Sequence, residues 1–314
     1  MPGSIVWLIA VLAVLPVAWL AGQRAAAIAD PVRRCCVIGA VFLLLLGWAV
    51  LIHHPAVAVE LIPLTALARL EGIGAAPLFV FVLGVGWRQA MVRRQRAVMV
   101  LGMCLGFGYF VQGGLWMLRP TPTNAFTQSG DRYFVEQSQD YSCVPAACAT
   151  SLRMLGIDTS EAEMAELTET RAGSGATLLR ALNGLNEKLA DTDIQPRLLE
   201  PTFDQLAKYQ TPMLTPLRYE AARLHMVTII EVRPHLVVIA DPQVGIEFVP
   251  RPVFEKSYRG QVIAFDGGGQ RADTKAVLEQ HPTLRDPDDP AAYPWLVRAE
   301  IETGAAAEVS SACP

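Results

Sequence analysis

Four long apolar runs dominate the first 118 residues of this chain. They cover approximately residues 5–22, 35–52, 72–87 and 97–118. Each run is close to the roughly 20 apolar residues that a helix needs to cross a bilayer, although 72–87 is short. Buried helices of a soluble core are a poor alternative, because four such runs leave too little polar surface to cover them. The pattern predicts a region of about four transmembrane helices, residues 1–118, with the lipid bilayer as its partner.

The basic residues of this region predict which way the helices run. Arginines gather in the first and third loops, at positions 24, 33, 34, 88, 93, 94 and 96. Arginine-rich loops stay in the cytoplasm, so both termini are expected outside in a multi-pass protein of the cytoplasmic (inner) membrane. The segment 56–69 leaves an alternative, because a crossing there would make the helix count odd. Residues 1–22 favour an uncleaved helix over a signal peptide, because Met-Pro-Gly-Ser at the start carries no Lys or Arg.

After residue 118 the pattern becomes that of a soluble domain. Residues 119–132 are predicted to be a linker, and a helix is predicted to start near Cys143, with Ser142 as its N-cap and Gly156 as its stop. Three further helices are expected: one from the capping box Ser160-Glu-Ala-Glu163, one over about 176–190 and a short one from Thr202.

Strands follow the helices. Six short segments of strand character are expected at 194–199, 213–218, 225–232, 235–240, 246–250 and 261–265. Arg233-Pro234 separates two of them and is typical of a hairpin turn. Helices first and an antiparallel sheet afterwards predict an α+β domain. Residues 266–314 show weak periodicity and are predicted to be a mobile C-terminal tail.

The charge of the chain excludes two classes of function. Residues 1–118 carry eight basic and three acidic side chains, whereas 119–314 carry 18 and 27. An acidic soluble half without a basic stripe argues against nucleic acid as a partner. The chain also has no phosphate loop of the GxxxxGK[ST] type, so it carries no ATPase motor and is not expected to use ATP.

The soluble half contains the parts of a thiol-dependent hydrolase. Cys143 is predicted at a helix N-terminus, which lowers the pKa of a thiol, and an adjacent imidazolium lowers it further. His225 is expected at the start of a strand, and Asp241 at the end of the next one, where its carboxylate could orient the imidazole. Gln137, six residues before Cys143, could form an oxyanion hole with the backbone N–H of Cys143.

Each of these residues also has an ordinary structural interpretation. A cysteine in an apolar helix usually belongs to the core, and Cys148 is best interpreted that way. Asp241-Pro242 alone would be a turn, and Gln137 alone would be a solvated side chain. The functional interpretation therefore depends on the joint spacing. No Cys/His cluster has metal-ligand spacing, so neither a zinc site nor any other cofactor is expected.

The spacing resembles that of the C39 family of cysteine peptidases, the bacteriocin-processing type with a papain-like fold. The resemblance covers about residues 133–265, including the run Asp241-Pro-Gln-Val-Gly245. It implies that Cys143 is the nucleophile, His225 the general base and acid, Asp241 the orienting residue and Gln137 the oxyanion donor. It also implies a peptide or protein substrate.

This sequence departs from the family pattern in two ways. Val144-Pro145 follows the cysteine where the best-known members have glycine, which alters the first turn of the helix. Members that process leader peptides are usually fused to an ABC exporter, whereas here the ATPase is absent and the helices precede the domain. A separate exporter is therefore the candidate partner, and cleavage after a double-glycine leader does not follow.

Three functional hypotheses remain open at this point. The first is a membrane-anchored cysteine peptidase with an extracytoplasmic domain, working through an acyl-enzyme and processing a leader or secreted peptide. The second is a catalytically idle C39-like module that binds a peptide for a membrane partner such as an exporter. The third, and weakest, makes the membrane half a small channel or transporter subunit with a regulatory domain.

Overall fold

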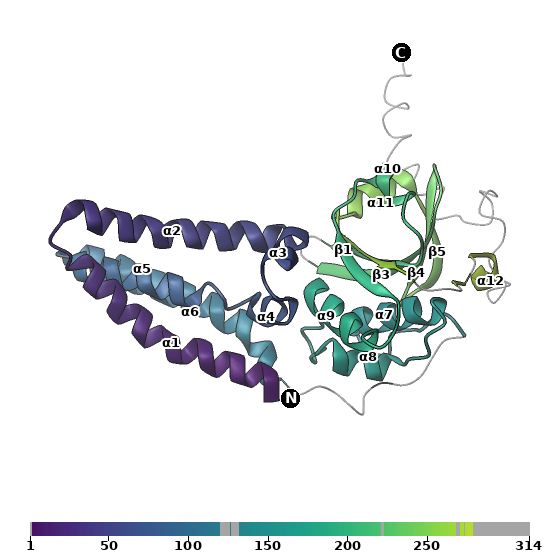
Figure 1. Cartoon of the computed structure of the whole chain (residues 1–314), viewed down its shortest axis with the longest axis horizontal. Helices are drawn as coiled ribbons and strands as arrows, with labels where there is room; N and C mark the ends of the chain where they lie inside the picture. Colours follow the sequence, from purple (N-terminus) through teal and green to yellow (C-terminus); the bar gives the residue numbers. More distant parts are fainter. Residues whose placement is uncertain are drawn as a thin grey trace, which may run out of the picture. The chain divides into compact units, whose positions relative to one another are not determined.

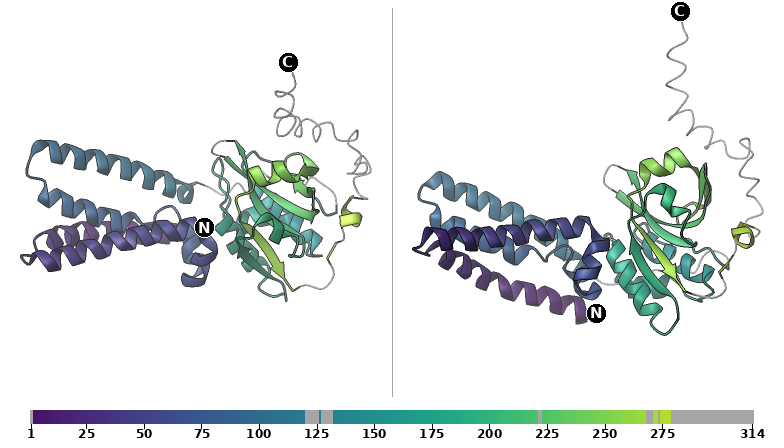
Figure 2. Two further views of the ribbon diagram at one scale, coloured as in Figure 1. Left: turned by 90° about the horizontal axis from the view of Figure 1, so that it is seen from above. Right: turned by 45° about the horizontal axis from the view of Figure 1, so that its top comes forward.

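The computed structural model describes residues 2–119, 126, 132–220, 223–267, 271–272 and 274–278. The chain divides into two compact units, Met1–Pro120 and Thr121–Pro314. Figures 1 and 2 show that the first unit consists of helices alone, whereas the second builds a sheet with helices on both of its faces.

Long apolar helices make up most of the first unit. Its elements are α1 (Pro2–Ala26), α2 (Pro31–His53), α3 (Pro55–Leu61), α4 (Leu64–Leu70), α5 (Ala76–Gln89), α6 (Arg93–Gly114) and the 3-10 turn η1 (Leu115–Leu118). Within the described residues, α1, α2 and α6 are long and apolar enough to cross a membrane. The two short helices α3 and α4 occupy the ambiguous segment between the second and third apolar runs.

The third apolar run differs from its expected form. It was predicted as a helix over 72–87, but α5 begins only at Ala76 and has 14 residues. At 1.5 Å per residue this helix is about 21 Å long, which is short of the roughly 30 Å of a bilayer core. Gly72 and Gly74 precede it, and they lie in a turn rather than in the helix. The described residues therefore contain three candidate membrane helices instead of about four.

The arginine-rich ends of these helices lie at one end of the first unit. Arg24 is in the last turn of α1 and Arg88 in the last turn of α5, while Arg33 and Arg93 begin the helices that follow. Figure 1 shows the α1–α2 and α5–α6 connections at the same end of this unit. Helix α5 lies against α1 so closely that a side chain at Gly84 would meet the carbonyl oxygen of Trp19.

The second unit begins with helices and ends with an antiparallel sheet, which is the α+β order expected. Its elements are α7 (Cys143–Met154), α8 (Glu161–Leu167), α9 (Leu178–Lys188), β1 (Gln195–Leu199), α10 (Phe203–Leu206), β2 (Met213–Glu220), β3 (Arg223–Val232), β4 (Leu236–Asp241), β5 (Gly245–Pro250), α11 (Arg251–Ser257), β6 (Val262–Asp266) and α12 (Thr274–Leu278). The strand order is β1-β6-β2-β3-β4-β5, and every neighbouring pair is antiparallel.

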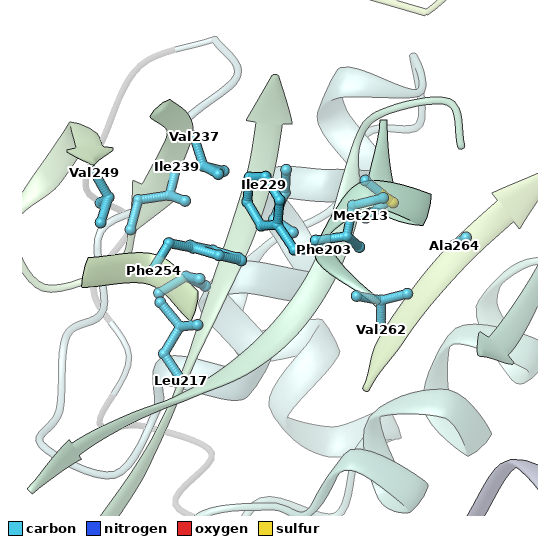
Figure 3. Close-up of a cluster of buried hydrophobic side chains, with 12 residues drawn as sticks. Phe203, Met213, Leu217, Ile229, Val237, Ile239, Val249, Phe254, Val262 and Ala264 are labelled. Atoms are coloured by element: carbon cyan, nitrogen blue, oxygen red, sulfur yellow. The ribbon is translucent and has the colours of Figure 1, made fainter. Parts of the chain in front are cut away.

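Alternating side chains of the strands fill a core on each face of this sheet. On one face Phe203 of α10 and Phe254 of α11 pack on strand residues such as Ile229 (Figure 3). On the other face Met154 of α7 packs with residues such as Val238. Because both faces are covered, β4 and residues 225–230 of β3 are buried.

The predicted elements of this unit are confirmed with small changes at their ends. All six strands form, and the N–H of Arg233 donates to the carbonyl oxygen of Leu236 across the expected hairpin turn. The capping box at Ser160 forms in one half only. Ser160 accepts from the N–H of Glu163, but the Glu163 carboxylate binds Thr159 and Lys188 instead of returning to the cap.

The beginning of the predicted mobile tail is packed on the domain. The N–H of Ala272 donates to the carbonyl oxygen of Met154 at 2.8 Å, and Val277 of α12 is buried in the core beside α7. Arg271 donates to the carbonyl oxygens of Thr211 and Gly267. A mobile tail therefore does not start at residue 266. Residues 279–314 of that prediction, and most of the linker predicted at 119–132, lie outside the described residues.

Candidate active site

Cys143 is the first residue of α7, as the sequence predicted. Ser142 occupies the N-cap position, but its hydroxyl binds Gln139 rather than the helix. Pro145 fits the first turn because its missing N–H has no partner to lose there. The helix ends at Met154, and Gly156, which has φ of +78°, follows the C-cap residue Leu155. The Val144-Pro145 departure from the family pattern therefore leaves the helix start intact.

Helix α7 is fixed to the strand that carries His225. The hydroxyl of Thr228 on β3 donates to the carbonyl oxygen of Ala147 at 3.0 Å, and its Oγ1 lies 3.2 Å from the Ser151 hydroxyl. All three groups are buried. Hydrogen bonds between buried groups have strict geometry, so they fix the position of α7 along β3.

His225 and Asp241 form a buried pair on neighbouring strands. The Nε2 atom of His225 lies 2.8 Å from Oδ1 of Asp241. The same Oδ1 accepts the backbone N–H of Gln243 at 2.7 Å, which fixes the carboxylate in the turn after β4. Asp241 is fully buried and His225 is 8% exposed. Since Nε2 faces the carboxylate, the other ring nitrogen, Nδ1, is the one available for the side-chain hydrogen bond between His225 and Cys143.

The electrostatics of the site favour a thiolate beside an imidazolium. Burial raises the pKa of the Cys143 thiol, but hydrogen bonding to His225, backbone hydrogen bonds from Met226 and Val144, and attraction to the imidazolium together bring that pKa below its ordinary value. Burial lowers the pKa of His225, but hydrogen bonds and charges of Asp241 and Cys143 outweigh it and raise the pKa to about 9. Both shifts favour the thiolate–imidazolium form, which is the charge state that an activated thiol nucleophile needs.

Gln137 is attached to the same turn as Asp241. Its N–H donates to the carbonyl oxygen of Pro242 at 2.8 Å, and its side-chain Nε2 donates to the carbonyl oxygen of Gln139 at 3.1 Å. Its Oε1 is buried without a hydrogen-bond partner among the described residues. An amide nitrogen carries two hydrogens, so one N–H of Gln137 remains for another acceptor.

One ionisable group of this neighbourhood was not predicted from the sequence. Glu247 on β5 has a pKa raised to about 7, first by burial and then by the charge of Asp241, while His225 opposes the rise. In the β4–β5 register Gly245 stands opposite Asp241 and Glu247 stands opposite Ile239. Glu247 lies near Asp241 because of that register, and no local sequence pattern indicates this proximity.

Cys148 lies in the core, as expected. It is fully buried, and burial together with the charge of Cys143 raises its pKa strongly. Among the described residues, no group of three or more His, Cys, Asp or Glu side chains could hold a metal ion.

Comparison with known proteins places these residues in a family. Residues 131–268 match the model of the Peptidase C39 family. An uncharacterized protein of Methanothermobacter thermautotrophicus (strain Delta H) is 33% identical over 140 residues, which is 45% of this chain and 92% of that protein. A second uncharacterized protein, from Methanothermobacter marburgensis, is 33% identical over 137 residues, 44% of this chain and 90% of that protein.

Two solved structures are similar to the second unit at low identity. The peptidase domain of Streptococcus ComA, a bi-functional ABC transporter involved in a quorum sensing pathway, has a TM-score of 0.38 and 20% identity, over 43% of this chain and 98% of that one. A double glycine motif protease from an AMS/PCAT transporter, in complex with the leader peptide, has a TM-score of 0.37 and 16% identity, over 44% and 95%.

Proposed function

This chain belongs to the peptidase C39 family, and we propose that it is a membrane-anchored cysteine peptidase that hydrolyses peptide bonds through an acyl-enzyme at Cys143. The observation that carries this proposal is the paired geometry of the site. His225 Nε2 lies 2.8 Å from buried Asp241, while hydrogen bonding to His225 helps to lower the pKa of Cys143. A structural cysteine in a core needs no such pair.

In the proposed acylation step, the Cys143 thiolate attacks the carbonyl carbon of the scissile peptide bond. The oxygen becomes negative and accepts hydrogen bonds from the backbone N–H of Cys143 and from the remaining side-chain N–H of Gln137. As the tetrahedral intermediate collapses, the C–N bond breaks and His225 gives its Nδ1 proton to the leaving amine. A thioester on Cys143 and a neutral imidazole remain.

Deacylation repeats this chemistry with water. Neutral His225 takes a proton from a water molecule at Nδ1, and the oxygen of that water attacks the thioester carbonyl. Collapse releases the carboxylic acid and restores the thiolate and the imidazolium. Asp241 stays hydrogen-bonded to Nε2 in both steps, so it holds the ring orientation and stabilises the imidazolium. No cofactor enters either step.

The proposal also places the peptidase domain outside the cytoplasm. Three described helices are apolar and long enough to cross a membrane, α5 returns the chain between α2 and α6, and the arginine-rich connections of this unit lie at one end of it. Such loops face the cytoplasm, whereas residue 119 follows the opposite end of α6. The substrate is then a leader or secreted peptide, and a separate exporter is the proposed partner.

The test of the activity is a digestion of a mixed peptide library by the purified full chain in detergent. Cleavage sites mapped by mass spectrometry are expected with the unchanged chain and absent with Cys143→Ala. Cys148→Ala is the matched control, because it removes a thiol of the same helix that the mechanism does not use, and it should cleave at the same sites.

A library that stays uncleaved would overturn the peptidase assignment. Peptides retained by both the unchanged chain and Cys143→Ala would then indicate the idle binding module instead. Sidedness is tested separately, with alkaline phosphatase fused after Leu118 or after Ile28. Alkaline phosphatase is active only outside the cytoplasm, so phosphatase activity is expected from the fusion after Leu118 alone. Phosphatase activity only from the fusion after Ile28 would show the opposite orientation.

A further inference from the structure

A short loop joins the oxyanion glutamine to the nucleophile. It runs from Gln137 to Ser142 and has no regular secondary structure. Inside it, the N–H of Gln139 donates to the Ser142 hydroxyl at 3.1 Å, and that hydroxyl donates back to the carbonyl oxygen of Gln139 at 2.9 Å. These bonds hold the end of the loop next to Cys143. The end that carries Gln137 needs other anchors.

One anchor comes from a buried carboxylate on a different helix. Glu161, the first residue of α8, is only 3% exposed. Its Oε1 accepts the backbone N–H of Ser138 at 3.0 Å, and its Oε2 accepts the Ser138 hydroxyl at 2.7 Å. Both carboxylate oxygens are therefore engaged by the residue that directly follows Gln137. Hydrogen bonds to a charged group are shorter and stronger than neutral ones.

A second anchor acts from the opposite side. The N–H of Gln137 itself donates to the carbonyl oxygen of Pro242, in the turn that follows Asp241. The two peptides on either side of the Gln137 Cα are thus held, the first by Pro242 in the turn after β4 and the second by Glu161 of α8. Because both of these peptide planes are fixed, the backbone at Gln137 has little freedom to rotate. The direction in which the Gln137 side chain leaves the backbone is set accordingly.

We propose that Glu161 is a positioning residue of this active site, which fixes the loop at Ser138 so that the amide of Gln137 is set for the developing oxyanion. This inference rests on the proposed function. A preorganised donor is effective because it does not have to reorient during the reaction, and small misplacements are costly. Glu161 touches neither the thiol nor the substrate, so it acts only through the loop.

The alternative is that Glu161 merely stabilises the fold. A buried carboxylate with two charge-assisted bonds is costly to disrupt, so its removal lowers stability under either view. The two roles differ in which reactions of Cys143 they affect. Loss of general structure would slow every reaction of the thiolate, whereas a misplaced oxyanion donor would slow only reactions in which a carbonyl oxygen becomes negative.

Two probes separate these cases with the purified full chain in detergent. Iodoacetamide alkylates the thiolate by displacing iodide, and no oxyanion forms. With 4-nitrophenyl acetate the thiolate adds to the ester carbonyl, an oxyanion forms, and 4-nitrophenolate leaves to give a thioester. The rate of each reaction is taken at Cys143 by subtracting the rate of Cys143→Ala.

We expect Glu161→Ala to slow acylation by about 10- to 100-fold, while alkylation changes by less than about two-fold. Glu161→Gln should recover most of the acylation rate, because its amide can still accept from the Ser138 N–H and donate to the Ser138 hydroxyl. Ser138→Ala, which keeps the backbone bond, should lie between the two. Glu163→Ala on the same helix is the matched control and should leave both rates unchanged.

The outcomes distinguish this inference from the proposed function. If Glu161→Ala acylates as fast as the unchanged chain, or loses both reactions by the same factor, the positioning role is wrong while the peptidase proposal stands. If the unchanged chain shows no acylation that depends on Cys143, the proposed function fails, and the positioning role fails with it.

Discussion

Nε2 of His225 lies 2.8 Å from Oδ1 of Asp241, and the two residues come from neighbouring antiparallel strands of the sheet. Sixteen residues separate the two in the chain, and the hairpin turn at Arg233-Pro234 brings their strands side by side. The carboxylate is fully buried, so water screens its interaction with the imidazole only weakly. The first prediction concerns this pair.

Asp241→Asn is expected to slow the alkylation of Cys143 by about 10-fold at pH 6. The amide keeps the shape of the site but removes the charge that raises the pKa of His225. The imidazole therefore loses its proton at a lower pH than in the unchanged chain, and it stabilises the Cys143 thiolate less at pH 6. Iodoacetamide labelling, located by tandem mass spectrometry, measures the rate. Asp204→Asn, at an exposed carboxylate on α10, is the control. An unchanged rate in Asp241→Asn would show that the carboxylate does not support the ion pair.

The pH profile of Cys143 should depend on His225. The pKa of Cys143 is lowered and that of His225 raised to about 9, so the thiolate and the imidazolium coexist between the two values. Alkylation of the unchanged chain should therefore persist well below pH 8. In His225→Ala burial still raises the pKa of the thiol and only the backbone hydrogen bonds from Met226 and Val144 oppose it, so labelling should rise only above pH 8. Two identical profiles would argue against the catalytic pair.

Glu247→Gln should stabilise the protein in a way that depends on pH. The folded pKa of about 7 lies above the ordinary value of 4.5, so the folded state binds more protons between those values. Stability then falls as pH rises from about 4.5 to 7, and the full penalty remains above pH 7. The variant should gain about 1–2 kcal/mol at pH 8, allowing for partial exposure, and almost nothing at pH 4. Denaturant unfolding at the two pH values measures this; an equal gain at both would contradict the assignment.

Gly184→Ala should destabilise the second unit, although alanine is the better helix former. Gly184 lies in the middle of α9, where the exchange normally gains about 1 kcal/mol. Here an added Cβ would meet the backbone of Leu167 at 2.8 Å and the N of Thr168 at 2.9 Å. Backbone cannot move aside as a side chain can, so we expect a net loss of about 1–3 kcal/mol. Thermal unfolding measures it, and Asn183→Ala on the same helix is the comparison. A raised Tm would show that α8 and α9 can separate at little cost.

The sequence predicts those features of the fold that local chemistry determines. A proline in the first turn and Gly156 at the end were enough to place α7 around Cys143, and alternating apolar residues were enough for six strands. Helix α11 was missed, because its seven residues are too few to show a helical period. The third apolar run was predicted too long, because composition alone does not show that Gly72 and Gly74 lie in a turn.

The sequence predicted the spacing of the candidate site residues, but not the residues of other elements that hold them in place. Cys143, His225 and Asp241 lie together as the spacing suggested, whereas the catalytic roles of these three residues and of Gln137 stay predictions. Glu161 reaches Ser138 across 23 residues of sequence, and it was seen only as part of a capping box. Glu247 comes near Asp241 through the register of β4 and β5. Contacts of this kind depend on how elements pack, which no local pattern encodes.

The burial of Cys148 has a consequence for chemical labelling. Helix α7 carries two thiols five positions apart, and they differ in both access and charge: Cys143 is partly exposed with a lowered pKa, whereas Cys148 is wholly enclosed with a raised one. An electrophilic warhead attached to a short peptide would therefore discriminate between them without any further design. Such an activity-based reagent, added to intact cells, could label the active enzyme. A library of such reagents could also identify the peptide sequences that bind beside its thiolate.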